Sequence, residues 1–225
     1  AQLAMRESDP AELKNSLRQI ATSVDRAAHL VNQLLTLARA EASDQGQQAL
    51  EPLDLDGILR GQVEEWVMRA LDKRIDLGYE AAPSSEILGN ALLLRELISN
   101  LIDNALRYTP EGGRVTCRVV VQGDFVTLEI EDNGIGLSEE QAALVFERFY
   151  RVDGTGVDGS GLGLAIVREI AELHHADASL RPNPVERGAV ARVVFSRHQP
   201  DVAQPAFDAQ VEGELGIRNP PIGFV

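Results

Sequence analysis

Three short motifs within residues 131–166 decide the fold: Glu-Asp-Asn-Gly-Ile-Gly-Leu at 131–137, Phe-Glu-Arg-Phe-Tyr-Arg at 146–151, and Gly-Ser-Gly-Leu-Gly-Leu-Ala-Ile at 159–166. Apolar and polar residues alternate over 126–131, which predicts a half-buried strand with Asp132 on the apolar face. A buried carboxylate is costly without hydrogen-bond donors, and the exocyclic amine of adenine is a suitable donor. The glycines at 134 and 136 would let the backbone approach a flat ring. A solvated hairpin turn is the simpler alternative for this motif taken alone.

The glycine loop of the third motif, with Gly159, Gly161 and Gly163, directly precedes an apolar helical run at 164–171. The free N–H groups at the start of such a helix favour phosphate oxygens. The loop lacks the Lys-Ser/Thr ending of a P-loop, and residues 146–156 separate it from the preceding strand. Neither a P-loop nor a Rossmann fingerprint therefore fits well.

Residues 91–108 are predicted to form a helix with two stripes. The apolar stripe contains Leu93, Leu97, Leu101 and Ala105, and the polar stripe contains Glu96, Asn100, Asn104 and Tyr108. Two amides one turn apart would face the same ligand, and their oxygens suit Mg²⁺, which also keeps water and phosphate ligands. Asparagines on a helix are otherwise often merely solvated.

Together with Asn-Leu-Ile-Asp-Asn-Ala-Leu-Arg-Tyr-Thr at 100–109, these motifs resemble the N, G1, F and G2 boxes of bacterial two-component sensor histidine kinases. The resemblance extends over about residues 11–197. It implies an α+β fold, the two-layer α/β sandwich of the Bergerat or GHKL ATP-binding domain, in which a mixed sheet carries helices on one face.

The resemblance also implies roles for individual residues. Asp132 would bind the adenine amine, Asn104 would bind Mg²⁺, and Asn100 would act catalytically on the phosphates or a metal-bound water. Arg107 and Tyr108 would meet the phosphate or ribose. Residues 152–159 would form an ATP lid. The other implied residues are the catalytic pair Arg148 and Arg151, which would offset charge on the γ-phosphoryl group, and the ATP-binding set Gly134, Gly136, Gly159, Ser160, Gly161, Leu162, Gly163 and Leu164.

Composition narrows the class of protein. The 225 residues carry a net charge of −14, which argues against a nucleic-acid partner. The single cysteine, Cys117, excludes an internal disulfide, fits a reducing cytoplasm and lies in an alternating run that predicts burial. No apolar stretch is long enough to span a bilayer and no signal sequence is apparent, so we expect this portion to be soluble as given, in the cytoplasm.

We expect three regions: a partial dimerisation and histidine-phosphotransfer unit at 1–48, a catalytic ATP-binding domain at 49–198 and a tail at 199–225. A heptad seam runs over 13–38, and the resemblance makes it the second helix of the dimerisation hairpin. The acceptor motif of the family, His-Glu-x-x-Arg-Thr/Ser-Pro, is absent from residues 1–10, and His29 is expected to be an ordinary helix residue. The chain is therefore expected not to phosphorylate itself.

Within the catalytic domain, Asp56 is predicted to cap a helix that contains Trp66 as a packing residue, and Asn90 to cap the amide-bearing helix. A helix is expected at 139–145, and His174 and His175 are expected to serve helix-end chemistry. The expected strands are 75–79, 86–88, 115–121, 125–131, 178–181 and 189–197.

The leading hypothesis is the ATP-binding portion of a sensor histidine kinase. It would transfer the γ-phosphoryl of Mg-ATP to a histidine upstream of this chain, for relay to an aspartate of a response regulator. The full-length parent would form a homodimer anchored in the inner membrane. One alternative is a non-catalytic nucleotide-binding or regulator-docking module. Another is a GHKL ATPase of the gyrase, mismatch-repair or heat-shock type, but such enzymes need a general base where Asn100 stands.

Overall fold

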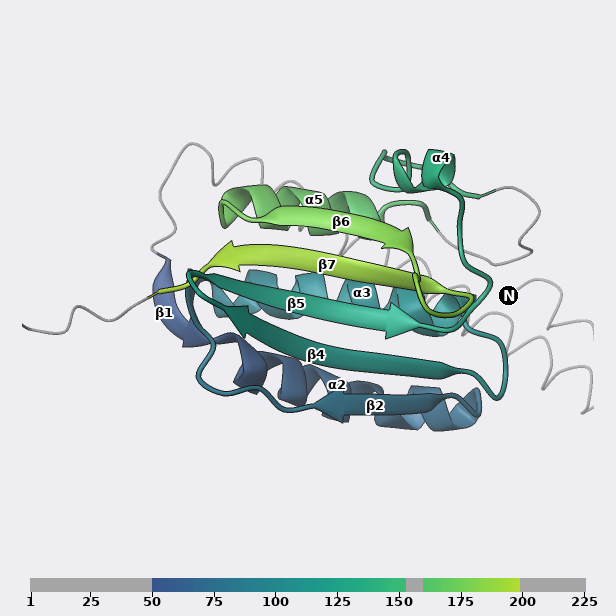
Figure 1. Cartoon of the computed structure of the whole chain (residues 1–225), viewed down its shortest axis with the longest axis horizontal. Coiled ribbons are helices and arrows are strands. Elements are labelled where there is room, and N and C mark those ends of the chain that lie inside the picture. Colours follow the sequence, from purple (N-terminus) through teal and green to yellow (C-terminus); the bar gives the residue numbers. More distant parts are fainter. Residues whose placement is uncertain (1–49, 153–159, 199–225) are drawn as a thin grey trace, which may run out of the picture.

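The computed structural model describes residues 50–152 and 160–198. The predicted heptad helix, most of the lid and the tail therefore lie outside the described residues. Five strands form one mixed sheet in the order β2-β4-β5-β7-β6, in which β2 runs parallel to β4 and all other neighbours are antiparallel (Figure 1). The strands are β2 (Asp76–Glu80), β4 (Arg114–Gln122), β5 (Phe125–Asp132), β6 (Asp177–Pro182) and β7 (Ala189–Ser196).

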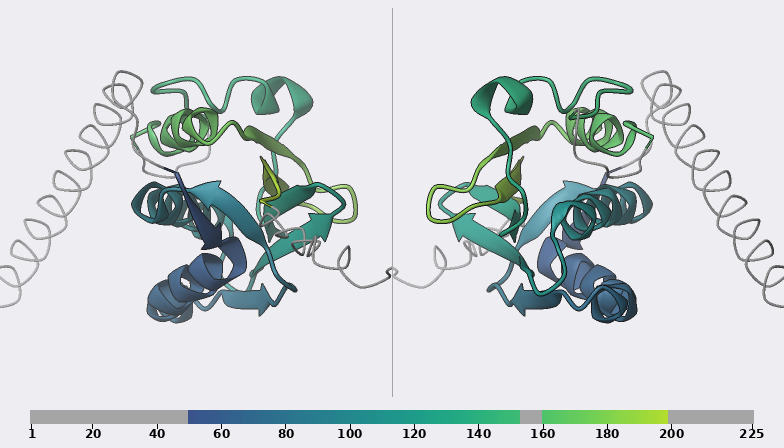
Figure 2. Two further views of the ribbon diagram at one scale, coloured as in Figure 1. Left: turned by 90° about the vertical axis from the view of Figure 1, so that its left-hand side faces the viewer. Right: turned by 90° about the vertical axis from the view of Figure 1, so that its right-hand side faces the viewer.

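Three helices cover one face of this sheet: α2 (Leu55–Asp72), α3 (Ala91–Tyr108) and α5 (Gly163–Leu173). Figure 2 views the sheet from its ends and shows these helices as a single layer against it. The short helix α4 (Glu139–Ala142) ends three residues earlier than predicted and lies near β6. The two-layer α+β sandwich predicted from the sequence is confirmed. Among the described residues, no helix is both long and apolar enough to cross a membrane.

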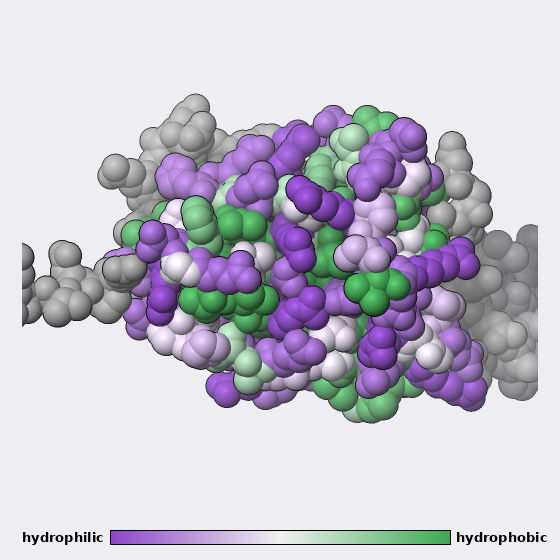
Figure 3. Space-filling model, in the orientation of Figure 1, coloured by the Kyte–Doolittle hydropathy of each residue, from purple (hydrophilic) through white to green (hydrophobic). Residues whose placement is uncertain are grey.

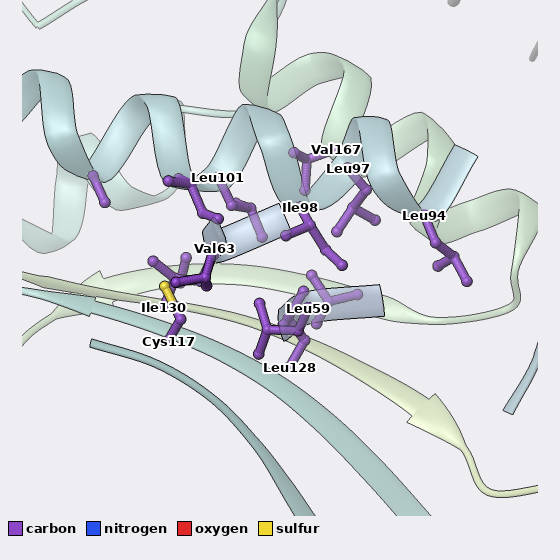
Figure 4. Packing of buried hydrophobic residues seen from close by; sticks show 14 of the residues in the cluster. Leu59, Val63, Leu94, Leu97, Ile98, Leu101, Cys117, Leu128, Ile130 and Val167 are labelled. Carbon is purple, nitrogen blue, oxygen red and sulfur yellow. The ribbon is translucent and has the colours of Figure 1, made fainter. Parts of the chain in front are cut away.

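The core lies between the helix layer and the sheet. In Figure 4, Leu97 and Ile98 of α3 point toward Leu59 of α2 and Leu128 of β5. All four side chains are fully buried, and each such burial stabilises the fold by about 1.5–3 kcal/mol. Cys117 is also fully buried, as predicted.

The other face of the sheet carries no helix and is largely hydrophilic (Figure 3). Charged side chains on neighbouring strands pair across it. The Nε of Arg118 donates to Oε2 of Glu129 at 2.9 Å, and the Nε of Arg192 donates to Oε1 of the same carboxylate at 2.7 Å. Opposite charges facing one another across strands stabilise their register. This network was not predicted from the sequence.

The start of α2 differs from the prediction. Asp54 is the N-cap, and its carboxylate accepts the backbone N–H of Gly57. Asp56 is instead buried within the first turn, where it accepts hydrogen bonds from Tyr79 Oη and from the backbone N–H of Ala82. The prediction that Asp56 caps the helix is therefore wrong, because this carboxylate binds the strand β2 and the segment after it. Trp66 is buried in the core as predicted.

Both ends of the described region meet at one short strand. β1 (Glu51–Asp54), which the sequence did not predict, pairs antiparallel with β3 (Glu86–Gly89). At the other end, the backbone N–H of His198 donates to the carbonyl of Glu86 at 2.8 Å. Both ends of the described region are therefore attached to β3.

Helices α3 and α5 are antiparallel, and His174 joins them. Asn90 caps α3 as predicted, accepting the N–H groups of Leu92 and Leu93. Its own backbone N–H donates to Nε2 of His174, the C-cap of α5, at 3.0 Å. Nδ1 of His174 lies 2.7 Å from the carbonyl of Ile170, which confirms the helix-end role predicted for this histidine. The glycine-rich start of α5 therefore lies toward the C-terminal half of α3.

Candidate nucleotide site

Asp132 is the last residue of β5 and lies on the helix-covered face of the sheet, where it is only 7% exposed. Its Oδ1 accepts the backbone N–H of Gly134 at 2.8 Å. Burial raises the pKa of Asp132 to about 6, although backbone hydrogen bonds from Gly134 and Ala189 oppose the shift. A carboxylate with so little water around it gains from a further hydrogen-bond donor.

The loop after β5 is attached to the end of α3. The backbone N–H of Ile135 donates to the carbonyl of Tyr108 at 3.3 Å. A Cβ atom on Gly134 would lie 2.5 Å from that same carbonyl oxygen, so no larger residue fits there without displacement. This glycine is thus required by the contact with α3, and the contact brings Asp132 to the end of the amide-bearing helix.

The amides of α3 lie one turn apart, as predicted. Asn100 is 6% exposed, and its Nδ2 donates to the carbonyl and to Oε1 of Glu96 at 2.9 and 3.1 Å. Because the amide nitrogen faces Glu96, the amide oxygen is turned away from it. Asn104 is half-buried. One turn farther on, Arg107 pairs with Asp103.

The C-terminal end of α3 also receives a lysine from α2. Nζ of Lys73 donates to the carbonyl of Leu106 at 2.6 Å. Partial burial lowers the pKa of Lys73, and the charge of Arg107 lowers it further. A cation at a helix C-terminus stabilises the terminal carbonyls, so Lys73 supports the turn of α3 that carries Arg107 and Tyr108.

The glycine loop leads into α5 as predicted. The helix starts at Gly163, and its N-cap, Leu162, supplies no side-chain hydrogen bond to the first turn. Ser160 Oγ accepts the backbone N–H of Leu162 at 3.2 Å. Gly161 has a φ of +70°, and its carbonyl accepts the backbone N–H of Phe149 at 2.8 Å. First-turn N–H groups without a side-chain cap suit an anionic ligand. Gly159 lies outside the described residues, and Leu164 is half-buried in the first turn of α5.

The segment 146–151 is joined to α5 by two ion pairs. Nη2 of Arg148 lies 3.6 Å from Oε2 of Glu169, and Nη1 of Arg168 lies 3.2 Å from Oε1 of Glu147. Arg151 is exposed. The structure thus engages Arg148 with α5, and the role predicted for Arg148 and Arg151 at the γ-phosphoryl group stays a prediction.

The turn between β6 and β7 contacts the loop after β5, and this contact was not predicted from the sequence. Gly136, with a φ of +72°, packs against Gly188, since a Cβ on Gly136 would lie 3.2 Å from the Gly188 carbonyl oxygen. Nε of Arg187 donates to the carbonyl of Ile135 at 3.0 Å. A shallow hollow of roughly 470 Å³ lies between this turn and the loop after β5. The isolated glycine before a strand in Arg187-Gly188-Ala189 is the sequence feature that could have indicated this close contact.

The described residues contain no cluster of the charged or sulfur ligands that form a metal site by themselves. Among residues 50–152 and 160–198, no three His, Cys, Asp or Glu side chains are grouped so that they could hold a metal ion. A cation here would rest on the amide oxygen of Asn104 and on phosphate oxygens of a ligand. This donor set fits Mg²⁺, which keeps most of its ligands as water and phosphate.

Two curated proteins illustrate the relatives of this chain. The sensor protein kinase PmrB of Pseudomonas aeruginosa is 36% identical over 206 residues, which are 91% of this chain and 43% of that protein. The sensor protein QseC of Escherichia coli is 41% identical over 170 residues, which are 75% of this chain and 36% of that protein. The chain thus spans less than half the length of either relative.

Solved structures of histidine kinases are also similar to this chain. The cytoplasmic segment of the histidine kinase QseC is 30% identical with a TM-score of 0.53, and the match covers 78% of this chain and 95% of that one. Full-length ShkA in complex with AMPPNP is 27% identical with a TM-score of 0.68, over 88% of this chain and 42% of that one. Residues 89–199 match the family described as histidine kinase-, DNA gyrase B- and HSP90-like ATPases. The chain belongs to the two-component sensor histidine kinases, and the described region is their ATP-binding catalytic domain.

Proposed function

We propose that this chain binds Mg-ATP and transfers the γ-phosphoryl group to a histidine that precedes residue 1 in the parent protein, for relay to an aspartate of a response regulator. The observation that carries the proposal is the position of Asp132. Asp132 is 7% exposed, and the loop that follows it bonds to the carbonyl of Tyr108, the last residue of α3. Along this helix Asn104 precedes Tyr108 by one turn and Asn100 precedes it by two. Asp132 and the two asparagines therefore belong to adjoining elements, which supports their assignment to the base and to the metal.

In the proposed complex, Asp132 accepts a hydrogen bond from the exocyclic amine of adenine. The Asn104 amide oxygen ligates Mg²⁺, which would neutralise phosphate charge when bound. Asn100 orients the phosphates or a metal-bound water, and Arg107 and Tyr108 meet the phosphate or ribose. The neighbour ShkA was solved with AMPPNP, an analogue of ATP, and this supports ATP as the ligand.

The glycine-rich start of α5 would receive the phosphates through its first-turn N–H groups. Arg148 and Arg151 would stabilise the charge that develops on the transferred group, which is where fixed cations contribute most to the rate. For Arg148 this requires that its ion pair with Glu169 opens, because the two atoms lie 3.6 Å apart in this structure. Arg148 is exposed and Glu169 is half-buried, and ion pairs near the surface contribute about 0–1 kcal/mol, so opening this pair costs little.

The acceptor histidine belongs to the remainder of the parent protein in this proposal. Residues 1–225 contain no His-Glu-x-x-Arg-Thr/Ser-Pro sequence. We assign residues 1–48 to a partial dimerisation unit, 49–198 to the catalytic domain and 199–225 to a tail. The parent would be a homodimer anchored in the inner membrane with this portion in the cytoplasm. That placement is supported by the similarity to the QseC structure, which is of a cytoplasmic segment.

The test uses the whole chain with ATP labelled at the γ-phosphoryl group and a separately made helical hairpin from the parent that carries the acceptor histidine. Label should pass to the hairpin, and Asp132→Ala and Asn104→Ala should each abolish transfer. A hairpin with the histidine replaced by glutamine is the control. Calorimetric Mg-ATP binding without any transfer would favour the non-catalytic module, and absence of binding would reject both functions.

The ATPase alternative has its own test. Glu96 lies one turn before Asn100 and accepts a hydrogen bond from the Asn100 amide. An ATPase that used Glu96 as its general base would lose steady hydrolysis in Glu96→Gln, whereas the proposed kinase would keep transfer to the hairpin.

A further inference from the structure

The turn between β6 and β7, residues 183–188, which we name the hairpin turn, is bonded to three separate parts of the molecule around Asp132. Nδ2 of Asn183 donates to Oε1 of Glu131 at 3.0 Å. Nε of Arg187 donates to the carbonyl of Ile135 at 3.0 Å. Nη2 of Arg114, on β4, lies 2.7 Å from Oε1 of Glu186. Asp132 therefore lies between two points, Glu131 and Ile135, that the hairpin turn holds.

A backbone contact lies at the centre of these bonds. Gly188 is buried with a φ of +139°, a conformation that residues with side chains rarely adopt. A Cβ atom at this position would lie 1.9 Å from the carbonyl oxygen of Asp132 and 2.8 Å from Cα of Asn133. The hairpin turn and the backbone of Asp132 and Asn133 thus approach so closely that a displacement of the turn would displace the backbone that carries the carboxylate.

The hairpin turn is itself well organised. Oδ1 of Asn183 accepts the backbone N–H groups of Val185 and Glu186 at 2.9 and 3.4 Å. The backbone N–H of Asn183 also donates to the carbonyl of Gly188 at 3.0 Å. The amide of Asn183 therefore closes the turn with its oxygen and holds Glu131, next to Asp132, with its nitrogen. Groups held by packing and secondary hydrogen bonds keep a binding side chain in its productive geometry.

We propose that the hairpin turn positions Asp132 for recognition of the nucleotide base, with Arg187 and Asn183 as positioning residues. The inference rests on the proposed function, since it takes Asp132 as the acceptor of the exocyclic amine of adenine. It adds that selectivity for adenine depends on side chains that need not touch the nucleotide. Arg187 acts through the carbonyl of Ile135, and Asn183 acts through Glu131.

The experiment compares ATP with inosine triphosphate, which carries the same phosphates and lacks the exocyclic amine. Calorimetry on the whole chain should show that the wild type prefers ATP. Arg187→Ala should weaken ATP binding about fivefold, the effect of one lost hydrogen bond, and leave inosine triphosphate binding unchanged. Arg187→Lys should restore part of the preference, because a lysine ammonium can also donate to the Ile135 carbonyl. Asn183→Ala should lower the preference as well.

Arg181→Ala is the matched control, because Arg181 is an exposed arginine on β6 outside the hairpin turn. The preference of Arg181→Ala for ATP should equal that of the wild type. Thermal unfolding of Arg187→Ala should show that the exposed Arg187 is not needed for folding. A full preference for ATP in Arg187→Ala would overturn the inference alone. Equal losses for both nucleotides would also overturn it, because they would indicate general support of the pocket. A wild type that binds neither nucleotide would overturn the proposed function together with this inference.

Discussion

The backbone N–H of Gly134 donates to Oδ1 of Asp132 at 2.8 Å, so the carboxylate at the end of β5 is held by the loop that follows it. This bond does not offset the loss of water, because burial still raises the pKa of Asp132 to about 6. The folded protein thus keeps a charge near neutral pH at a cost in stability. Binding a hydrogen-bond donor would recover part of that cost.

Asp132→Asn should therefore stabilise the nucleotide-free protein at pH 7.5. The pKa of Asp132 is about 6 in the folded state and 3.8 as the reference value, so the charged form costs about 2 to 3 kcal/mol above pH 6. The folded state binds the proton more tightly, and wild-type stability falls as pH rises from about 4 to about 6. Urea unfolding should show the full gain at pH 7.5 and roughly half of it at pH 5. Glu139→Gln, at an exposed position, is the control, and a loss of stability in Asp132→Asn at pH 7.5 would contradict the prediction.

The same titration should appear in nucleotide binding. The ionised carboxylate is the better acceptor for the adenine amine, so affinity for ATP should fall as pH decreases through about 6. Inosine triphosphate provides the control, since its phosphates titrate as those of ATP do. The ratio of the two affinities, measured from pH 5.5 to 8, should rise with pH and level off above 7. A ratio that does not change with pH would show that Asp132 does not read the base.

His174→Ala should lower the free energy of unfolding by about 2 to 4 kcal/mol. The substitution leaves the backbone N–H of Asn90 without its acceptor and removes an edge-to-face contact with Phe195, whose ring centroid lies 6.3 Å away. Burial lowers the pKa of His174 below 6.5, so stability from this residue is complete above pH 6.5 and is lost as pH falls. Denaturant unfolding at pH 7.5 and 5.5 measures both effects. His175→Asn, at an exposed position with a φ of +52°, should change little.

Gly161→Ala should destabilise the protein more than Gly123→Ala, although both glycines have positive φ, +70° and +57°. A Cβ on Gly123 meets no atom within 4 Å, whereas one on Gly161 would lie 2.7 Å from the carbonyl carbon of Phe149. Gly123→Ala adds backbone strain of about 1 kcal/mol, and Gly161→Ala adds a steric clash to a similar strain. Comparison of the two melting temperatures isolates the contact with Phe149, and equal losses would show that this contact does not contribute.

Cys117 should not react with thiol reagents in the folded protein. Its side chain is fully buried, and burial raises the pKa of its thiol to about 12, so almost no thiolate is present at pH 8. Colorimetric thiol titration should detect no fast-reacting group in native protein and one group in 6 M guanidinium chloride. Rapid labelling of native protein would contradict the burial of β4 against the helices.

Hydrophobic periodicity predicted the bounds of most elements to within one or two residues, because the side chains that a helix or a strand buries in the core recur at a fixed spacing along the sequence. β1 was missed because Glu-Pro-Leu-Asp at 51–54 has no alternation and only one apolar residue that is partly buried. The cap of α2 was misplaced by two residues because Asp54 and Asp56 are chemically equivalent in sequence. Only the tertiary contact with Tyr79 distinguishes them.

The motifs of the candidate site were predicted from the sequence, but the contacts that hold them in place were not. Short motifs show which residues carry polar chemistry, and in the structure the loop after Asp132 meets the backbone of Tyr108 at the end of α3. The motifs do not show which residues pack against the loop after β5. The contact of Gly136 with Gly188 depends on pairing between β5 and β7, which are separated by more than fifty residues in the chain and paired in register. The ion pair between Arg148 and Glu169 is likewise a product of the packed fold.

Both ends of the described region are attached to β3, beside the edge of the sheet where β5 begins and β7 ends. β5 and β7 extend away from that edge, and the eight residues of β5 put Asp132 about 25 Å from the strand's other end. The two strands are paired without a break from Phe125 and Ser196 to Asp132 and Ala189, so a displacement applied at β3 would be carried to the loop after Asp132 by the sheet as one unit.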